Sequence, residues 1–407
     1  MSKKIVVLGA GTAGTIVSNN LRRHLPADWE ITIIDRDDNH LYQPGLLFVP
    51  FGIQKSSTLV KSRKKYITPG INFVIDEITH IDPDKKQVKT RNHQFDYDFL
   101  VISTGCRINP EENDGMMDAW GKNVFTFYYL EMADMLRQKL SEFQGGKIVM
   151  NIAEMPIKCP VAPIEFVFLA DWYAKSKGIR NKTEIELVTP LPGAFTKPKA
   201  SEILGGMLDK KNIRLTPDFG IASIDNEGEK IVSFDEKEIE FDVLVTVPTN
   251  MGDDYVERSG MGDELNFIPT DQSTLQSKEH ENIYVIGDAT DLPSSKAGSV
   301  AHFQADILME NFLDAIEGRK PEASFDGHAN CFIESGFGKG ILIDFNYDTE
   351  PLPGKFPLPG IGPFSLLEET QMNHYGKVMF RWVYWNLLLR GLELPIESHM
   401  TMAGKRA

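Results

Sequence analysis

The feature that most constrains the fold is a glycine-rich turn close to the N-terminus. Residues 4–8 are apolar and β-branched, as in a buried parallel strand, and they lead into the GxGxxG pattern at residues 9–14. Residues 15–25 predict an amphipathic helix, and a second predicted strand, residues 31–34, ends at Asp35, 21 residues after the last glycine. In this order the glycines let the backbone approach a pyrophosphate at the helix N-terminus, and the acid meets the ribose hydroxyls. We therefore predict a dinucleotide site that contains Gly9, Gly11, Ala13, Gly14 and Asp35.

Two later predicted strands also end in short motifs of the kind found in dinucleotide sites. Residues 95–105 predict a strand that ends in Ser-Thr-Gly, and residues 282–288 predict one that ends in Gly-Asp. Together with the N-terminal turn, this set resembles the FAD-binding pattern of the two-dinucleotide flavoproteins, which have the glutathione reductase-like fold. The resemblance implies an α/β chain with two Rossmann-like domains and FAD as the cofactor.

The same resemblance implies which side chains contact FAD. Asp288 is implied to hold the ribitol chain, and residues 295–301 are implied to begin a helix directed at the flavin ring. A helix N-terminus in that place stabilises the anion of a reduced flavin. The predicted FAD site therefore also includes Thr104, Gly105, Gly287, Asp288, Lys296 and Ala297.

The equivalent turn of the second Rossmann-like domain is built differently. Residues 147–152 predict a strand, but Ala-Glu-Met-Pro-Ile-Lys-Cys-Pro follows at residues 153–160, and no glycine lies between Gly146 and Gly178. Prolines and side chains that carry a Cβ keep a backbone from wrapping around a pyrophosphate. We therefore predict that this domain binds no NAD and that a nicotinamide is not the electron donor.

Cys159 stands where the glycines are missing. Residues 161–177 predict a helix, with Pro160 at its first position. A thiol at a helix N-terminus has a lowered pKa, and the thiolate is the reactive form. Cys331, in the strand-like residues 330–338, is the expected partner in a redox role. The alternative is a buried cysteine that acts only as a small hydrophobic side chain.

Four features together resemble the sulfide:quinone oxidoreductases, which are related to the flavin subunit of flavocytochrome c sulfide dehydrogenase. They are the Cys-Pro-x-Ala-Pro-x-Glu stretch at residues 159–165, the Ser-Thr-Gly, the Gly-Asp and the late cysteine. In that family two cysteines take up sulfide sulfur and pass two electrons to FAD, which a quinone reoxidises. The resemblance implies that Cys159 and Cys331 are this pair and that Glu165 is a proton shuttle. The alternative for Glu165 is a carboxylate that the helix dipole favours.

One cysteine departs from the family pattern. Many members carry a cysteine downstream of the Ser-Thr-Gly that tethers the flavin covalently, but residues 124–129 contain none. Cys106 directly follows Gly105 instead. The Ser-Thr-Gly turn of this fold lies nearer the pyrophosphate than the methyl edge of the flavin. We therefore predict that FAD is held without a covalent bond.

The C-terminal part differs in composition from the rest. Residues 351–364 are rich in proline and glycine and predict a boundary. Residues 371–392 contain three Lys or Arg residues, five aromatic residues and no acid. Residues 378–389 are too few to span a bilayer but suit a helix in the headgroup region, close to a membrane quinone. The alternative is a helix docked on the core or on a second subunit.

Bulk composition narrows the class of protein. A formal charge of -15 argues against a nucleic-acid partner, because neutralising phosphates needs clustered Lys and Arg. Three cysteines make no disulfide framework, and the N-terminus leaves no room for a signal peptide. We expect a cytoplasmic, peripheral membrane protein that acts on sulfide and a quinone, forms a homo-oligomer and holds no metal.

The domain limits and the rival functions complete the prediction. The expected parts are residues 1–108 and 282–325 for the FAD domain, 109–281 for the domain with Cys159, and 326–407 for the C-terminal region. A type II NADH:quinone dehydrogenase is disfavoured by the missing second glycine motif. A soluble sulfide dehydrogenase paired with a cytochrome is disfavoured by the absent export signal. A non-catalytic flavoprotein that senses redox state through its cysteines is the third rival.

Overall fold

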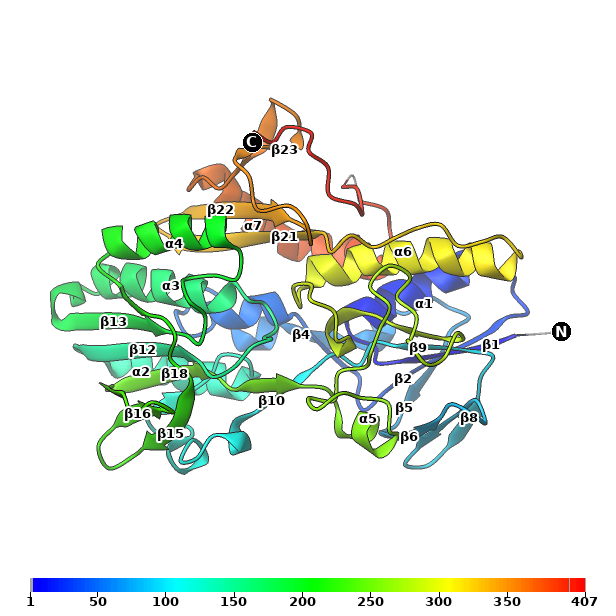
Figure 1. The fold of residues 1–407 in the computed structure, drawn as a ribbon, viewed down its shortest axis with the longest axis horizontal. Coiled ribbons are helices and arrows are strands. Elements are labelled where there is room, and N and C mark those ends of the chain that lie inside the picture. Colours follow the sequence, from blue (N-terminus) through cyan, green and yellow to red (C-terminus); the bar gives the residue numbers. More distant parts are fainter. Residues whose placement is uncertain (1–2, 395, 407) are drawn as a thin grey trace.

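The computed structural model describes residues 3–394 and 396–406, and two parallel sheets form its two halves (Figure 1). The first sheet has five strands, and each neighbouring pair in it is parallel. In sheet order they are β20 (Ile283–Val285), β9 (Phe99–Ile102), β1 (Lys4–Leu8), β2 (Glu30–Asp35) and β5 (Asn72–Ile75). Because β20 joins this sheet after the whole second half has been built, motifs far apart in the sequence meet at its carboxyl edge.

Two helices cover one face of the first sheet. They are α1 (Thr12–His24) and α6 (Gly298–Ile316), which pack against each other (Figure 1). The last turn of α1 carries Arg22, Arg23 and His24, which suit the negative end of the helix dipole. The N-termini of both helices point toward the middle of the molecule, where the two halves meet.

The second sheet is also parallel and five-stranded. In sheet order its strands are β11 (Val124–Phe125), β18 (Val243–Val247), β12 (Gly146–Ile152), β13 (Thr183–Val188) and β14 (Arg214–Thr216). The associated helices are α2 (Leu130–Glu142), α3 (Ala162–Ser176) and α4 (Pro198–Lys210). The α/β class with two Rossmann-like units is confirmed, whereas the exact domain limits stay a prediction.

Small antiparallel units complete and connect the two halves. The pair β10 (Arg107–Asn109) and β19 (Thr249–Met251) carries the chain from the first sheet to the second and back (Figure 1). The others are β3 (Asn39–Leu41) with β4 (Val60–Ser62), β6 (Ile78–Asp82) with β7 (Gln87–Thr90) and β8 (Gln94–Asp96), and β15 (Ile221–Asp225) with β16 (Lys230–Ser233) and β17 (Glu238–Glu240). A short helix, α5 (Asp254–Arg258), follows β19.

The C-terminal region is a sheet with a helix on it. Its strands, in sheet order, are β21 (Ala329–Gly336), β22 (Lys339–Phe345), β24 (Gly362–Leu366) and β23 (Gly354–Leu358). The proline- and glycine-rich residues that predicted a boundary therefore form the β23–β24 hairpin. Helix α7 (Gln371–Asn386) packs on β22 and β21 and starts earlier than predicted, because the Thr370 hydroxyl accepts a bond from the Asn373 amide.

Candidate functional site

The first strand-to-helix turn leaves helix N–H groups open to a cavity. Helix α1 begins at Thr12, and the preceding Gly11 provides no side-chain cap. A Cβ on Gly14 would lie 1.9 Å from the Gly9 carbonyl oxygen, whereas a Cβ on Gly11 would meet no atom within 4 Å. Gly14 therefore allows the tight turn, and Gly11 keeps space free at the helix N-terminus. Gly11 and Thr12 line a cavity of about 530 Å³ there.

Asp35 lies at the end of β2 beside the same turn. Its carboxylate accepts bonds from the Ala10 amide at 2.7 Å and the Arg36 amide at 2.8 Å, and it is ion-paired with Arg63. Burial raises the pKa of Asp35, and the Arg63 charge opposes that shift. Arg63 also lines the cavity and was not predicted, because it comes from a 3-10 helix, η3 (Arg63–Lys65), outside every motif.

The Ser-Thr-Gly and Gly-Asp motifs meet because β9 and β20 are neighbours. The Thr104 hydroxyl is 2.9 Å from the Tyr255 hydroxyl, and Gly105 and Gly287 have positive φ angles of 73° and 69°. The Gly287 amide donates to Gln304 Oε1 at 2.6 Å. Gln304 Nε2 is buried and has no partner among the described residues. Its N–H groups can therefore donate a hydrogen bond to a bound ligand.

Asp288 lies next to the N-terminus of α6. Its carboxylate accepts no hydrogen bond from the part of the chain that the structure describes, and burial raises its pKa. Lys296 Nζ donates instead to the carbonyl oxygens of Asp288 and Thr290, at 3.0 and 2.7 Å. Ala297 is the N-cap of α6 and provides no side-chain cap. The predicted residues thus leave an unpaired acid and free helix N–H groups at one place.

These groups fit FAD. The open N–H groups of α1 suit a pyrophosphate, and Asp35 suits a ribose. Asp288 suits the hydroxyls of a ribitol chain, and the N-terminus of α6 suits the electron-rich edge of an isoalloxazine ring. The Lys296 ammonium group is hydrogen-bonded to backbone carbonyls, and the part of Lys296 in the FAD site stays a prediction.

The second strand-to-helix turn is closed by the protein itself. After β12, the Lys158 amide donates to Asn250 Oδ1 at 3.1 Å, and the Cys159 amide donates to the Lys296 carbonyl at 2.6 Å. Cys159 has a φ of 53°, in the left-handed region, and its carbonyl accepts the Ala162 amide at 2.8 Å. Helix α3 begins at Ala162, so the prediction of Pro160 as its first residue is wrong by two positions.

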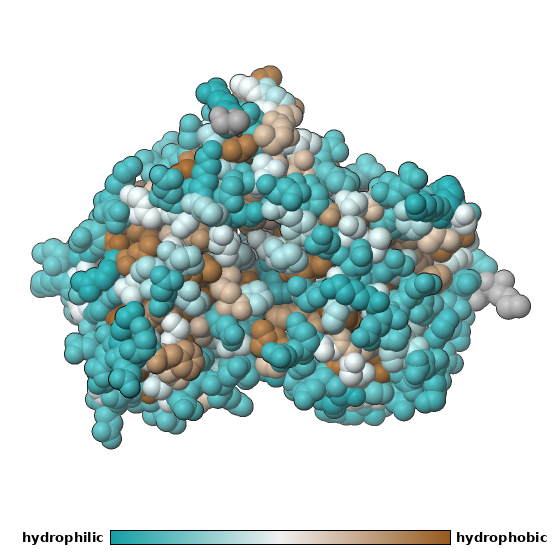
Figure 2. Space-filling view, viewed as in Figure 1, coloured by the Kyte–Doolittle hydropathy of each residue, from teal (hydrophilic) through white to brown (hydrophobic). Residues whose placement is uncertain are grey.

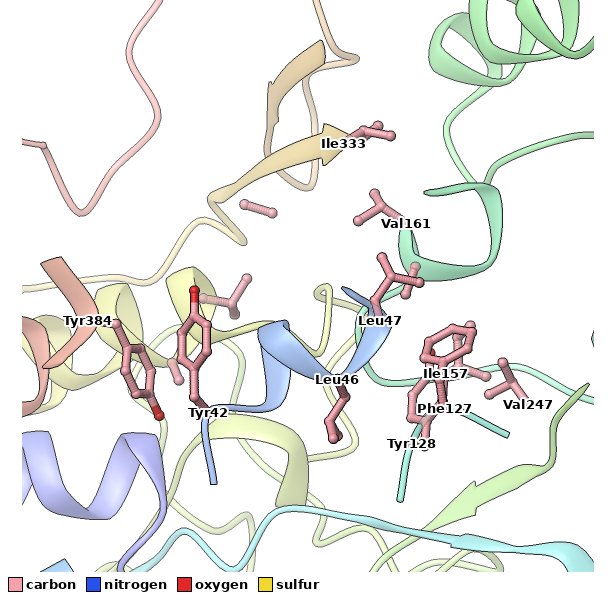
Figure 3. Packing of buried hydrophobic residues seen from close by; sticks show 14 of the residues in the cluster. Tyr42, Leu46, Leu47, Phe127, Tyr128, Ile157, Val161, Val247, Ile333 and Tyr384 are labelled. Carbon is pink, nitrogen blue, oxygen red and sulfur yellow. The ribbon is translucent and has the colours of Figure 1, made fainter. Parts of the chain in front are cut away.

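The two predicted redox cysteines both lie next to the α6 N-terminus. The Cys159 amide donates a hydrogen bond to the carbonyl of Lys296, which lies just before α6. The hydroxyl of Ser299, in the first turn of α6, donates to the carbonyl of Asn330, the residue before Cys331. Helix α3 packs on β21, and Figure 3 shows Val161 and Ile333, two residues beyond each cysteine, next to each other. Both cysteines are free thiols.

The predicted lowering of the Cys159 pKa is wrong. Burial raises the pKa of Cys159 to about 12, Glu165 and Cys331 raise it further, and the Lys377 ammonium opposes them. Burial also raises the pKa of Cys331 to about 12, again against Lys377. Desolvation exceeds the effect of the helix N-terminus at both of these half-buried cysteines. The resting thiols are therefore protonated at neutral pH.

Glu165 is buried in the first turn of α3 beside a buried cation. One carboxylate oxygen accepts from Lys377 Nζ at 2.8 Å and from the Glu334 amide at 2.7 Å, and the other has no partner among the described residues. Burial raises the pKa of Glu165, and Lys377 opposes that shift. Lys377 is one of the three Lys or Arg residues at positions 371–392, the segment of the predicted membrane-contact helix, whereas the structure places its ammonium group beside Glu165 and the Phe332 carbonyl.

Cys106 lies beside the second turn. Its Sγ is 3.7 Å from Asn250 Oδ1, the same atom that accepts the Lys158 amide. Lys158 Nζ donates to the Cys106 carbonyl at 3.3 Å. Burial first, and then the charge of Asp288, raise the pKa of Cys106 to about 12.

Helix α7 is docked on the core through one face. The Tyr384 hydroxyl is 2.7 Å from both Thr12 Oγ1 and His40 Nε2, and Figure 3 shows its ring beside that of Tyr42. Across the described residues, the structure contains no helix with the length and apolarity that a bilayer crossing requires. The inner face of α7 therefore packs on the core, which is the alternative that the sequence left open. Contact of its outer face with a membrane stays a prediction.

Known proteins resemble this chain over most of its length. The family model of the pyridine nucleotide-disulphide oxidoreductases matches residues 3–305. Mitochondrial sulfide:quinone oxidoreductase of Mus musculus is 24% identical over 95% of this chain and 86% of its own. The type II NADH:quinone oxidoreductase of Staphylococcus saprophyticus is 23% identical over a smaller share of this chain, 84%, and over 90% of its own.

A solved structure shares the whole fold. The sulfide:quinone oxidoreductase of Aquifex aeolicus superposes with a TM-score of 0.79 and 20% identity, over 96% of this chain and 92% of its own. The resemblance predicted from the sequence motifs is thereby confirmed. The assignment of individual site residues is not tested by these comparisons and stays a prediction.

Proposed function

The chain belongs to the pyridine nucleotide-disulphide oxidoreductase family and uses FAD, and we propose that it is a sulfide:quinone oxidoreductase. The observation that carries the proposal is the placement of both Cys159 and Cys331 next to the α6 N-terminus. That helix end is the part of the FAD site that suits the flavin ring. Two sulfur atoms there support a two-electron transfer from a sulfur substrate to the cofactor.

In the proposed cycle the substrate itself supplies the nucleophile. The two thiols that the structure describes must first be oxidised to a disulfide, with loss of two protons and with FAD, when bound, as the two-electron acceptor. Hydrosulfide then attacks the disulfide between Cys159 and Cys331, which leaves a persulfide on one cysteine and a thiolate on the other. This step does not need a thiolate in the resting enzyme, so the raised thiol pKa values are compatible with it. Lys377, the main charge that opposes those raised values, stabilises the departing thiolate.

FAD, when bound, accepts the two electrons from sulfur and delivers them to the quinone. The balanced reaction is hydrosulfide plus quinone plus one proton, giving one sulfur atom at the oxidation level of elemental sulfur plus quinol. One proton must therefore enter the site in each turnover. Glu165 is the proposed carrier, because one of its carboxylate oxygens is buried without a partner among the described residues while Lys377 holds the other.

The second strand-to-helix turn supports this function over NADH oxidation. Its Lys158 and Cys159 amides are bonded to Asn250 and Lys296, so they are not available to phosphate oxygens. We propose that residues 109–281 bind no nicotinamide and serve to place Cys159. We also propose that α7 attaches the chain peripherally to a membrane that contains the quinone.

An anaerobic half-reaction experiment tests the proposal. Sulfide should bleach the flavin of the wild-type holoenzyme, and a water-soluble short-chain quinone should restore its colour. Cys159→Ser and Cys331→Ser should slow bleaching by about a thousandfold or more, because a hydroxyl is a poor nucleophile and sulfur carrier. Both variants, reduced with dithionite, should still be reoxidised by quinone.

Cys106→Ser is the matched control, since this half-buried cysteine also has a pKa raised to about 12 but is not one of the pair proposed to react with sulfide. It should bleach at close to the wild-type rate. Unchanged bleaching in the Cys159 and Cys331 variants would reject the proposed cysteine chemistry. A wild-type flavin that sulfide does not reduce would reject the function itself.

A further inference from the structure

Three polar side chains from distant parts of the chain meet in one line of hydrogen bonds. Thr12 is the first residue of α1, His40 lies in β3, and Tyr384 lies in the last turn of α7. The Tyr384 hydroxyl is 2.7 Å from Thr12 Oγ1 and 2.7 Å from His40 Nε2, across 372 and 344 positions of sequence. We call these three residues the Tyr384 relay.

The relay is enclosed by protein but reaches a cavity. Tyr384 and His40 are each 2% exposed, so neither contributes to the hydrophilic surface that covers most of the face in Figure 2. Thr12 and His40 both line the cavity of about 530 Å³ at the N-terminus of α1. A ligand in that cavity therefore meets the Thr12 end of the relay.

The surroundings of His40 decide its charge and the place of its proton. Burial, and then the positive charge of Arg63, lower the pKa of His40 to about 3 against the Ala10 backbone, so the ring is neutral at pH 7. A neutral imidazole carries one N–H. His40 Nδ1 is buried and makes no hydrogen bond to the described residues, whereas Nε2 faces the Tyr384 oxygen. Because a buried N–H without an acceptor is costly, the proton belongs on Nε2.

This proton position sets the direction of the relay. His40 Nε2 donates to the Tyr384 oxygen, so the single hydroxyl proton of Tyr384 is left for Thr12 Oγ1. Thr12 then accepts from Tyr384 and keeps its own hydroxyl proton, which no group of the described residues takes up. The opposite tautomer of His40 would reverse both bonds and use the Thr12 proton on Tyr384.

A hydroxyl that is left with only a proton to offer suits a ligand group that only accepts. The first N–H groups of α1 are open to the same cavity, because Gly11 provides no side-chain cap, and the Arg63 guanidinium also lines it. A helix N-terminus and a cation together favour an anion. Ionised phosphate oxygens only accept hydrogen bonds, and bonds to them are stronger than bonds to neutral groups.

We propose that Tyr384 is a positioning residue of the FAD site, which holds the Thr12 hydroxyl with its proton directed at the FAD pyrophosphate. Since the bonds act in series, His40 and Tyr384 also polarise the Thr12 hydroxyl and strengthen the bond that it donates. Helix α7 then takes part in cofactor binding through a residue that lies outside every dinucleotide motif. The proposal depends on the FAD site and not on the sulfide chemistry.

A double-mutant cycle on the FAD affinity of the full-length chain tests the proposal. Thr12→Val keeps the side-chain shape, and it should weaken FAD binding about thirtyfold, as for one lost bond to a charged group. Tyr384→Phe should weaken it about fivefold, because the Thr12 hydroxyl remains but is neither oriented nor polarised. The double variant should bind about thirtyfold more weakly, and not about 150-fold, because Tyr384 has no hydroxyl left to act on. Fluorescence titration of apoprotein measures the affinities, and circular dichroism checks the fold.

The matched control removes another hydroxyl from the same aromatic cluster. The Tyr66 ring packs on Trp385 and on His40, with ring centroids 5.0 and 6.5 Å apart, but Tyr66 does not line the cavity. Tyr66→Phe should therefore keep FAD affinity within about twofold of the wild type. Equal losses in Tyr66→Phe and Tyr384→Phe would show a general effect of packing around α7 and would overturn the proposal. So would single losses that multiply in the double variant.

The His40 ring provides a second readout that a merely structural role of Tyr384 does not predict. In wild-type holoenzyme labelled with ¹⁵N-histidine, and with His40→Gln to identify the signals, Nε2 should show the chemical shift of a protonated ring nitrogen and Nδ1 that of an unprotonated one. Neither signal should titrate between about pH 5 and pH 8, because the pKa of His40 lies at about 3. A proton on Nδ1 would reverse the relay, leave Thr12 without a free proton and overturn the proposal.

Failure of this inference is distinct from failure of the proposed function, because neither measurement uses sulfide or a quinone. The expected cycle and tautomer, in a protein whose flavin sulfide does not bleach, would keep this inference and reject the function. Multiplying losses of FAD affinity, in a protein whose flavin sulfide bleaches normally, would do the reverse.

Discussion

The two strand-to-helix turns occupy equivalent places in their sheets and use their N–H groups in opposite ways. At the β1–α1 turn, glycines let the chain pass within a tight space, and the helix N-terminus faces a cavity. At the β12–α3 turn, the Lys158 and Cys159 amides are bonded to Asn250 and Lys296. The first turn leaves helix N–H groups open to the cavity of the proposed FAD site, and the second is hydrogen-bonded to β19 and to the residue before α6.

The difference shows how a nucleotide site can become a site for thiol chemistry without a new fold. A phosphate site needs free donors and close backbone approach, which glycine provides. A thiol that must be held in one position needs a turn whose backbone N–H groups are already hydrogen-bonded within the protein. The bond from the Cys159 amide to the Lys296 carbonyl meets that need and aligns the thiol with α6.

The largest expected effect is on the electron donor. NADH should reduce the flavin at least about a thousandfold more slowly than sulfide, since two or three charge-assisted bonds to phosphate are missing. Anaerobic stopped-flow absorbance of the holoenzyme with each donor measures this ratio. Fast bleaching by NADH would show that the second turn still binds a nucleotide, and the contrast between the turns would fail.

The next effect concerns the open space at the first turn. Gly11→Leu should fold, because a Cβ there meets no atom within 4 Å, but its side chain should fill the space of the pyrophosphate. FAD affinity should fall by about a hundredfold, or about 2.7 kcal/mol. Flavin fluorescence titration of apoprotein measures the affinity, and circular dichroism checks the fold.

The control for this variant lies in the second turn. Glu154 is exposed just after β12, so Glu154→Leu should bind FAD as the wild type does. If both leucine variants lost FAD equally, the two turns would not differ in the way described. Retention of normal affinity in Gly11→Leu would place the pyrophosphate elsewhere.

A third prediction concerns the protonation of Cys159. Because its pKa is raised to about 12, its thiolate fraction below that pH falls tenfold for each unit of pH decrease. Alkylation by iodoacetamide should therefore speed up about tenfold per unit, with no plateau between about pH 7 and pH 9. Mass spectrometry of the Cys159 peptide measures the rate. A plateau near neutral pH would restore the lowered pKa that the helix N-terminus predicted.

The sequence predicted the parts of the site that depend on local motifs. Gly9, Gly11 and Gly14 follow from one strand-turn-helix pattern, and the absence of glycine at the second turn is equally local. The Cys159 pKa was predicted with the wrong sign, because a sequence shows the helix N-terminus but not the depth of burial. Desolvation depends on all neighbouring elements and cannot be read from one segment.

Residues that act across long sequence separations were missed for the same reason. Lys377 meets Glu165 across 212 positions, and Arg63 meets Asp35 across 28. Each looked like an ordinary surface cation in its own segment. The fold class was predictable because hydrophobic strands and turn glycines are periodic signals, whereas the partner of a single charged side chain is set by packing.

The smallest expected effect is at Cys106, whose hydrogen bonds reach Asn250 and Lys158 at the second turn. Its Sγ shares Asn250 Oδ1 with the Lys158 amide, but a thiol–oxygen contact of 3.7 Å is a weak bond. Cys106→Ala should therefore keep sulfide oxidation within about a factor of two, because the stronger Lys158 amide bond remains to hold the second turn. FAD should be released by acid precipitation from both proteins, with the yellow colour in the supernatant. Colour that stays in the wild-type pellet and leaves the Cys106→Ala pellet would reveal a covalent link to this sulfur. Cys106 would then be part of the cofactor site rather than only a neighbour of the second turn.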